Sequence, residues 1–229
     1  MEKILAAVAA LAMFACTAVE AKAAITIANA TFDSPDVLGP PADNGATYGG
    51  ATDWTLSGTG GTWDIANYPA LQTSTQYWAP GYTFGQVGWL AIGPDSGFSQ
   101  FSQELGTGLT TNTSYTLSGL VGHPVGFGAT HVPATVYRVE LWAGTTLLAF
   151  TQGTGPEGQM GAFSLTYGTG NTLVSNGLLE IRLQTSTAQT AYDNIQLDAT
   201  ATPEPASIVM WGAMVSVGAA LAYRRRRGA

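Results

Sequence analysis

The sequence predicts an all-β fold, an antiparallel β-sandwich, followed by a single C-terminal transmembrane helix. Three observations support this fold class. Short runs that alternate apolar and polar residues recur between Ala24 and Thr200, separated by Gly, Pro, Asn, Ser and Thr. No helical period interrupts them, so antiparallel connections are expected. Near the C-terminus, an apolar stretch over residues 206–223 precedes four arginines.

Two runs show the alternation most clearly, Val136–Trp142 and Leu178–Leu183. Arg138 and Arg182 fall on the polar side of these runs, each beside an acid, which is typical of a solvent-facing strand surface. The apolar side is predicted to comprise Tyr137, Val139, Leu141, Leu179, Ile181 and Leu183. Further strands are predicted at 24–28, 88–92, 99–105, 114–121, 147–151, 162–167 and 191–197, with weaker ones near Trp54 and Trp63. Together they make a two-sheet sandwich of roughly eight to eleven strands.

The first 23 residues have the pattern of a signal peptide. A charged start precedes an apolar run over 4–19, and Ala21-Lys22-Ala23 supplies the small residues that signal peptidase reads. Cleavage after Ala23 leaves residues 24–200 as the exported sandwich. The chain's one cysteine, Cys16, lies in the removed segment, so the sandwich is expected to have no disulfide and no cysteine nucleophile.

Residues 201–229 are interpreted as a sorting and anchoring tail. Eighteen residues of helix, 206–223, span about 27 Å, just enough for the hydrocarbon core of a bilayer. The order of the tail is Pro203-Glu204-Pro205, the apolar stretch, and then Arg224, Arg225, Arg226 and Arg227. The arginines are expected to stay on the cytoplasmic side, which places the sandwich outside. An ordinary single-span anchor is the alternative.

This order resembles the PEP-CTERM sorting signal of exported proteins in Gram-negative bacteria that make extracellular polysaccharide. The resemblance implies export across the inner membrane and recognition by an exosortase, with processing near Pro203-Glu204-Pro205. It further implies a transient membrane anchor and a final location at the cell surface or outside the cell.

Charge limits the partners of the exported part. Between residues 24 and 200 there are two basic and twelve acidic residues, a formal charge near −10. Such a surface repels phosphate backbones, so binding of nucleic acid is excluded.

The sandwich also resembles galactose-binding-like jelly rolls, which include many carbohydrate-binding modules. The resemblance rests on the segments 29–33, 54–58, 101–105 and 192–197, which fall in the expected order. It implies a jelly-roll fold and a structural Ca²⁺ shared by an acid after the first strand and an Asp in the last strand. The matching positions are Asp33 and Asp193. The alternative is a turn at Asp33 and a hydrogen bond to the backbone at Asp193.

Seven aromatic residues crowd into positions 63–89, and they give a candidate ligand surface. Tyr77, Trp78 and Tyr82 lie in a predicted loop, where their rings could stack on pyranose sugars. Trp63 and Trp89 fall in predicted strands and are interpreted as core. His123 and His131 share another loop without a recognisable metal spacing.

These observations predict a non-enzymatic structural or adhesive protein of the cell surface or polysaccharide matrix. The alternative is a carbohydrate-binding module that recognises extracellular polysaccharide through Tyr77, Trp78 and Tyr82. An enzyme is disfavoured because the sandwich has no cysteine, no nucleophile-elbow pattern and no distinguished pair of carboxylates.

Overall fold

The computed structural model describes residues 22–36, 49–64, 85–92, 98–125, 136–186, 189–202 and 205–227. The chain divides into two compact units, which we describe separately. One is the sandwich, Ala23–Ala199, and the other contains the C-terminal helix.

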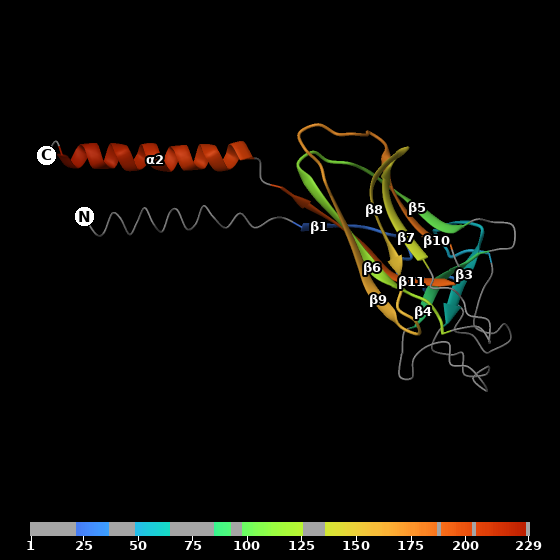
Figure 1. Cartoon of the computed structure of the whole chain (residues 1–229). Helices are drawn as coiled ribbons and strands as arrows, with labels where there is room; N and C mark the ends of the chain where they lie inside the picture. Colours follow the sequence, from blue (N-terminus) through green and yellow to red (C-terminus); the bar gives the residue numbers. More distant parts are fainter. Residues whose placement is uncertain are drawn as a thin grey trace. The chain divides into compact units, whose positions relative to one another are not determined.

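The sandwich consists of two antiparallel sheets (Figure 1). The six-stranded sheet has the order β3-β4-β11-β6-β9, with β1 added beside β11, and the five-stranded sheet has the order β2-β5-β10-β7-β8. Within the described residues the strands are β1 (Lys22–Ile25), β2 (Thr55–Ser57), β3 (Thr59–Asp64), β4 (Gln86–Ala91), β5 (Ser99–Gly108), β6 (Thr113–Gly122), β7 (Val136–Ala143), β8 (Thr146–Thr154), β9 (Met160–Gly168), β10 (Leu178–Thr185) and β11 (Thr190–Ala201). The predicted all-β, two-sheet antiparallel sandwich is thereby confirmed.

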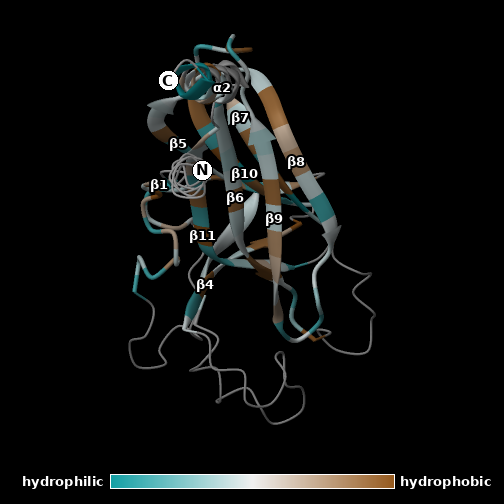
Figure 2. Cartoon of the chain, turned by 90° about the vertical axis from the view of Figure 1, so that its left-hand side faces the viewer, coloured by the Kyte–Doolittle hydropathy of each residue, from teal (hydrophilic) through white to brown (hydrophobic). Residues whose placement is uncertain are grey.

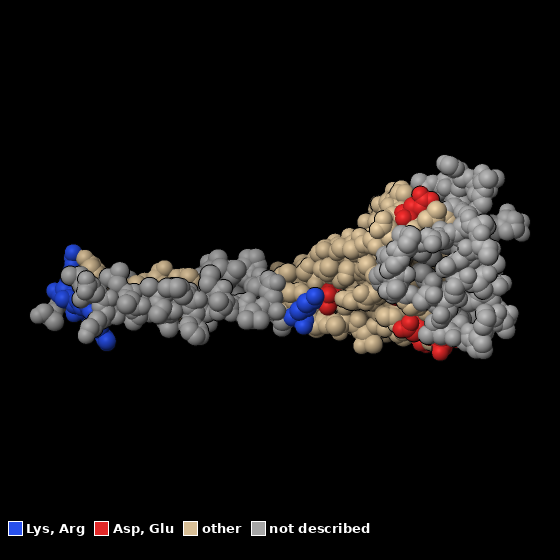
Figure 3. Space-filling view, turned by 90° about the horizontal axis from the view of Figure 1, so that it is seen from below, with Lys and Arg blue, Asp and Glu red and all other residues tan. Residues whose placement is uncertain are grey.

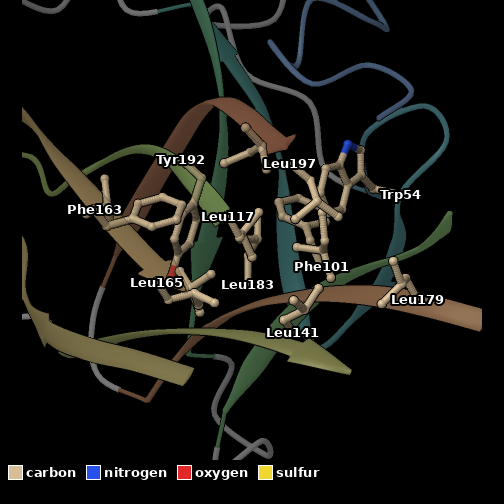
Figure 4. Close-up of a cluster of buried hydrophobic side chains, with 14 of the residues drawn as sticks. Trp54, Phe101, Leu117, Leu141, Phe163, Leu165, Leu179, Leu183, Tyr192 and Leu197 are labelled. Carbon is tan, nitrogen blue, oxygen red and sulfur yellow. The ribbon is translucent and has the colours of Figure 1, made fainter. Parts of the chain in front are cut away.

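The core lies between the two sheets, and aromatic rings fill one part of it (Figure 4). Phe32 stacks on Trp54, with ring centroids 5.1 Å apart, and also contacts Phe101 at 5.5 Å. Aliphatic side chains, most of them leucines, and further aromatic rings from β6, β7, β9, β10 and β11 complete the core. Burial of these side chains is the main favourable contribution to folding, since the sandwich has no disulfide.

Strand alternation assigns the two faces of each sheet (Figure 2). On β10, Leu179, Ile181 and Leu183 are fully buried in the core, as predicted. Arg182 points to the other side, where it forms an ion pair with Glu180 at 2.8 Å. Arg138 likewise pairs with Glu140 on β7. Both arginines therefore lie on the outer surface of the five-stranded sheet, each beside an acid.

The tail forms helix α2, Pro205–Arg227, with Arg224 to Arg227 in its last turn. Figure 3 shows these basic side chains gathered at one end of the tail. Within the described part of the chain, no helix is both long enough and apolar enough to cross a membrane. The helix is therefore present, but the transmembrane span predicted over 206–223 is not found among the described residues.

Candidate functional site

Strand β11 presents a second, smaller apolar surface on the outside of the six-stranded sheet. Tyr192 and Leu197 belong to the main core. Because side chains alternate along a strand, Ala191 and Asp193 face the opposite side of the sheet from Tyr192. Ala191 belongs to a separate cluster of buried side chains. The side chains on the outer side of β11 are therefore also buried at these two positions.

Two tryptophans dominate this second cluster, which consists of Trp63, Val87, Trp89 and Ala191. Pairing across the strands brings them together, because Trp63 lies opposite Val87, and Trp89 lies opposite Ala191. Both indole rings are only 5% exposed. We call this surface, together with Asp193, the tryptophan face.

Asp193 places a carboxyl group on the tryptophan face. Its side chain is 8% exposed, and its Oδ1 accepts a hydrogen bond from the backbone N–H of Asn194 at 2.7 Å. Burial raises the pKa of this carboxyl to about 6; the Asn194 hydrogen bond lowers the pKa, and the negative charge of Asp33 raises it. A carboxyl with such a pKa takes up and releases protons close to neutral pH.

Asp33 approaches Asp193 from the other end of the sandwich chain, close enough for its charge to raise the pKa of Asp193. The segment around it is fixed by Asn29, whose side-chain N–H donates to the carbonyls of Ser34 and Thr52. The backbone N–H of Ile195 donates to the carbonyl of Ala30 at 2.9 Å, which ties this segment to β11. The Thr31 hydroxyl donates to Asp33 Oδ2 at 2.6 Å. The fold thus brings the two predicted carboxylates within electrostatic reach of each other.

The other predicted site residues are not brought into this site. Tyr77, Trp78 and Tyr82 lie outside the described residues, as do His131, Pro203 and Glu204. Pro205 begins helix α2, and Arg227 stacks over the ring of Tyr223 at 4.7 Å. His123 is buried beyond the end of β6, with its Nδ1 3.2 Å from the carbonyl of Pro124.

The sequence predicted Trp63 and Trp89 as buried core residues of strands, and this prediction is confirmed. It did not show that they form a cluster of their own, separate from the main core. The neighbouring Leu90 belongs to that core, so Trp89 must face outward. The run Gly88-Trp89-Leu90 places Trp89 and Leu90 on opposite faces of the strand. Without knowledge of the partner strand, it does not show which of the two faces lies between the sheets.

Comparison with known proteins places the sandwich in a family. A family model described as HpiC1-like, HpiC1 cyclase, matches residues 23–198. A search among curated proteins finds no match.

Solved structures share the fold. A Stig cyclase, FisC, from Fischerella sp. TAU, in complex with (3Z)-3-(1-methyl-2-pyrrolidinylidene)-3H-indole, is 22% identical with a TM-score of 0.65, covering 80% of this chain and 100% of that one. A cyclase from the same organism in complex with 4-(1H-indol-3-yl)butan-2-one is 22% identical with a TM-score of 0.63 and the same coverage. A CBM4 structure reaches a TM-score of only 0.41 at 17% identity, covering 75% of this chain and 98% of that one, and carries no argument about function.

The site thus belongs to an all-β sandwich of the kind seen in cyclases. The chain itself is a member of the HpiC1-like cyclase family, whose model covers nearly the whole sandwich.

Family membership corrects the predicted function. The expectation of a non-enzymatic structural or adhesive protein is wrong, and so is its alternative, a carbohydrate-binding module, because the family is one of cyclases. The missing cysteine and nucleophile elbow argue only against chemistry that needs an activated nucleophile. Ring closure can instead proceed on an enclosed apolar surface with one proton-transferring group, a combination that leaves no short motif in a sequence.

Proposed function

We propose that the sandwich is a cyclase that binds an apolar substrate with an aromatic ring system against the tryptophan face, and that Asp193 transfers the proton of the reaction. The family match over residues 23–198 is the observation that carries this proposal. The indole compounds bound by the two Fischerella cyclases suggest an indole-bearing substrate.

The chemistry of the tryptophan face supports this assignment. Indole rings offer large flat apolar surfaces, and aromatic ligands pack on them in stacked or edge-to-face arrangements. Trp89 on β4 lies directly opposite Ala191 on β11, and Asp193 follows two residues later on the same side of the strand. Two residues of a strand span about 7 Å, comparable to the length of a fused bicyclic ring. A ring system stacked beside Trp89 can therefore reach the carboxyl group with an attached side chain.

The proposed cyclisation needs no oxidant, because atoms and electrons are conserved between substrate and product. The Asp193 carboxyl donates its proton to an unsaturated carbon or a carbonyl oxygen of the substrate. An electron pair from a second double bond then forms the new ring bond, which leaves a positive charge on the substrate. Loss of a neighbouring proton to the Asp193 carboxylate restores both the acid and a neutral product. Substrate and product are isomers, and the aromatic faces stabilise the positive charge between the two steps.

Turnover by the variant Asp193→Asn tests the proposal. The experiment incubates the full chain with indoles that carry an unsaturated side chain and follows, by liquid chromatography and mass spectrometry, a product of unchanged mass and shifted retention. General acid catalysis contributes about 10²–10⁴-fold, so the variant should lose at least about 100-fold in turnover. It should still bind 4-(1H-indol-3-yl)butan-2-one, which we call the indolyl butanone probe. Turnover by Asp193→Asn at the wild-type rate would overturn the role of Asp193.

We also propose, as an alternative occupation of the same carboxylates, that Ca²⁺ lies between Asp33 and Asp193, in keeping with the jelly-roll resemblance. The two carboxylates and the Thr31 hydroxyl are oxygen donors, which suit Ca²⁺ in kind. Ca²⁺ takes six to eight oxygens, and the described residues contain no group of three or more acidic, His or Cys side chains. Backbone carbonyls and water would have to complete the coordination.

Asp193 cannot bind Ca²⁺ and act as the proton donor at the same time. A bound cation keeps the carboxylate ionised, whereas proton transfer needs a carboxyl that is protonated for part of the time near neutral pH. Isothermal titration calorimetry with CaCl₂ at pH 7, on wild-type protein and on Asp33→Asn, separates them. Binding that is lost in the variant supports calcium, and the absence of heat in both proteins contradicts it.

We further propose that the chain is exported by a Gram-negative bacterium, is cut by signal peptidase, and has its tail processed by an exosortase at the outer face of the inner membrane. The basic last turn of α2 and the Pro-Glu-Pro triplet support this route. The test is intact-mass spectrometry of the protein from cells with and without the exosortase gene. Loss of about 25 residues from the C-terminus only in its presence is expected, and the same mass in both strains would contradict the proposal.

A further inference from the structure

A methionine from the far strand of the six-stranded sheet packs against the tryptophan face. Met160 is the first residue of β9, and it contacts the cluster of Trp63, Val87, Trp89 and Ala191. The members of that cluster lie on β3, β4 and β11, and strand β6 separates β11 from β9. The Met160 side chain therefore reaches across β6 to meet the cluster.

Small residues on the intervening strands make this reach possible. Met160 is paired with Gly122 on β6, and a Cβ at Gly122 would lie only 3.0 Å from the Met160 sulfur. The sulfur thus occupies space that any other residue at position 122 would need for its own side chain. Ala191 on β11 likewise leaves room beside Trp89, its partner on β4. The thioether lies between the backbone of β6 and the cluster.

Met160 also differs from the rest of the sandwich in its chemistry. It is the only methionine between residues 24 and 200, because the other four of the chain lie in the leader and in helix α2. The one cysteine, Cys16, lies in the leader as well. The residue is half-buried, whereas Trp63 and Trp89 are buried. The single sulfur of the sandwich therefore belongs to a residue that solvent reaches.

We infer that Met160 is a site of reversible oxidation, at which conversion to the sulfoxide by hydrogen peroxide weakens ligand binding on the tryptophan face. The inference rests on the proposed function in one respect, because it takes the tryptophan face as the ligand surface. Susceptibility to this reaction follows from the thioether, which is oxidised without any activating group.

The modification is a two-electron transfer from sulfur to peroxide. A lone pair of the Met160 sulfur attacks one peroxide oxygen, the O–O bond breaks, and that oxygen stays on the sulfur. The other oxygen leaves as water with both hydrogens of the peroxide. Methionine sulfoxide reductases reverse the change, with a thiol as the reductant.

The added oxygen conflicts with the surroundings of the sulfur. A sulfoxide is polar, and placing it against an apolar cluster removes its hydrogen bonds to water unless the side chain moves away. On the β6 side, the close approach to Gly122 leaves no space for another atom. The side chain therefore has to withdraw from the cluster, and Trp89 loses a neighbour that supports the proposed ligand surface.

Binding of the indolyl butanone probe to the full chain, measured by calorimetry before and after peroxide treatment, tests the inference. Peptide mass spectrometry first establishes that Met160 has gained one oxygen. The dissociation constant of the wild type should then rise at least about fivefold, and reductase with dithiothreitol should restore it.

Two variants complete this test. Met160→Leu is the matched control, since leucine has a similar volume and every other oxidisable side chain is kept, and peroxide should leave its affinity unchanged. Met160→Gln carries a polar oxygen permanently and should bind the probe weakly without peroxide.

Tryptophan fluorescence gives a second measurement that needs no ligand. Oxidation should shift the emission of the wild type to longer wavelength, because the cluster loses an apolar neighbour, and should leave that of Met160→Leu unchanged. A probe that fails to bind the untreated wild type would contradict the proposed function, whereas the fluorescence comparison still decides the role of Met160.

Either of two results overturns the inference. One is a Met160 that stays reduced in the folded chain at a peroxide concentration that oxidises it in urea. The other is an identical response of wild type and Met160→Leu to peroxide.

Discussion

At the scale of single residues, the surroundings of Asp193 bring the pKa of its carboxyl close to neutral pH. Its carboxyl is 8% exposed, and burial raises its pKa to about 6 from an ordinary value of 3.8. Between these two pKa values the folded chain binds a proton that the unfolded chain has released. The ionised carboxylate therefore lowers stability above about pH 6, and this loss disappears as the pH falls toward 4.

The first prediction concerns how the stability contributed by Asp193 depends on pH. In metal-free buffer, the stability of the wild-type protein relative to Asp193→Asn should rise as the pH falls from 7 to 4. Urea unfolding at several pH values, followed by fluorescence, measures the difference. Asp33→Asn should shift the transition to lower pH, because it removes a negative charge that raises the pKa of Asp193. A pH-independent difference between wild type and Asp193→Asn would contradict the assignment.

The second prediction concerns Ala191, which is 1% exposed and lies between Trp89 and Asp193 on the tryptophan face. A leucine at this position should weaken binding of the indolyl butanone probe at least tenfold, because a larger side chain in this buried cluster would displace the Trp89 ring on which the ligand is proposed to stack. Ala162→Leu makes the same change on the outer side of β9, at an exposed position, and should leave binding unchanged.

Calorimetric titration of both variants, after their melting temperatures have been compared, checks this prediction. If Ala191→Leu unfolds, Ala191→Gly replaces it and should bind the probe with altered affinity while Ala162→Gly does not. Equal affinities in folded Ala191 and Ala162 variants would place the ligand elsewhere.

At the scale of elements, strand β4 depends on a glycine to hold the aromatic core together. A Cβ at Gly88 would lie 2.5 Å from the ring of Phe32, which itself stacks on Trp54. Gly88→Ala should therefore cost about 1–3 kcal/mol, because a tightly packed core does not absorb an added methyl group. At Gly170 a Cβ would meet nothing within 4 Å, so Gly170→Ala is the control. Chemical denaturation of both variants measures the difference, and equal midpoints would contradict the packing argument.

The strands themselves could be predicted from the sequence, because a period of two residues is local. Tyr137, Val139 and Leu141 alternate with charged neighbours, and β7 forms as the pattern indicates. Asp33 and Asp193 are 160 positions apart, so only a resemblance suggested that they lie near each other, and the Ca²⁺ that the resemblance implies stays a prediction. The tryptophan face was not predictable in this way. Trp89 lies between Gly88 and Leu90, and Trp63 lies between Thr62 and Asp64, so their neighbours do not show which side of each strand faces the main core.

Function was harder still to predict from composition. The predicted ligand surface was a cluster of aromatic residues in one loop, Tyr77, Trp78 and Tyr82. The residues that carry the proposed chemistry are instead single positions on separate strands. Asp193 has no special sequence context beyond its place in the last strand. Its raised pKa arises from burial and from Asp33, both of which are properties of the folded chain.

At the scale of the whole molecule, Asp33 and Asp193 come from opposite ends of the sandwich chain, and the charge of Asp33 raises the pKa of Asp193. Any Ca²⁺ held by both would bind the folded chain only, and would raise the melting temperature with increasing concentration. We expect a rise on adding 1 mM CaCl₂ at pH 7 that EDTA reverses and Asp33→Asn abolishes. Differential scanning fluorimetry measures it. A melting temperature that responds to neither CaCl₂ nor EDTA would favour the protonated form of the site.

The alternation of β11 separates positions that stabilise the core from positions that can vary during evolution. Tyr192 and Leu197 hold the core, while Ala191 and Asp193 belong to the opposite face of the same strand. A mutation at Ala191 or Asp193 alters the tryptophan face, and a mutation at Tyr192 alters the main core and therefore the stability of the fold. Residues of the tryptophan face can therefore change without removing side chains from the main core. A combinatorial library over positions 87, 89 and 191, with Leu90 and Tyr192 kept, explores that freedom directly.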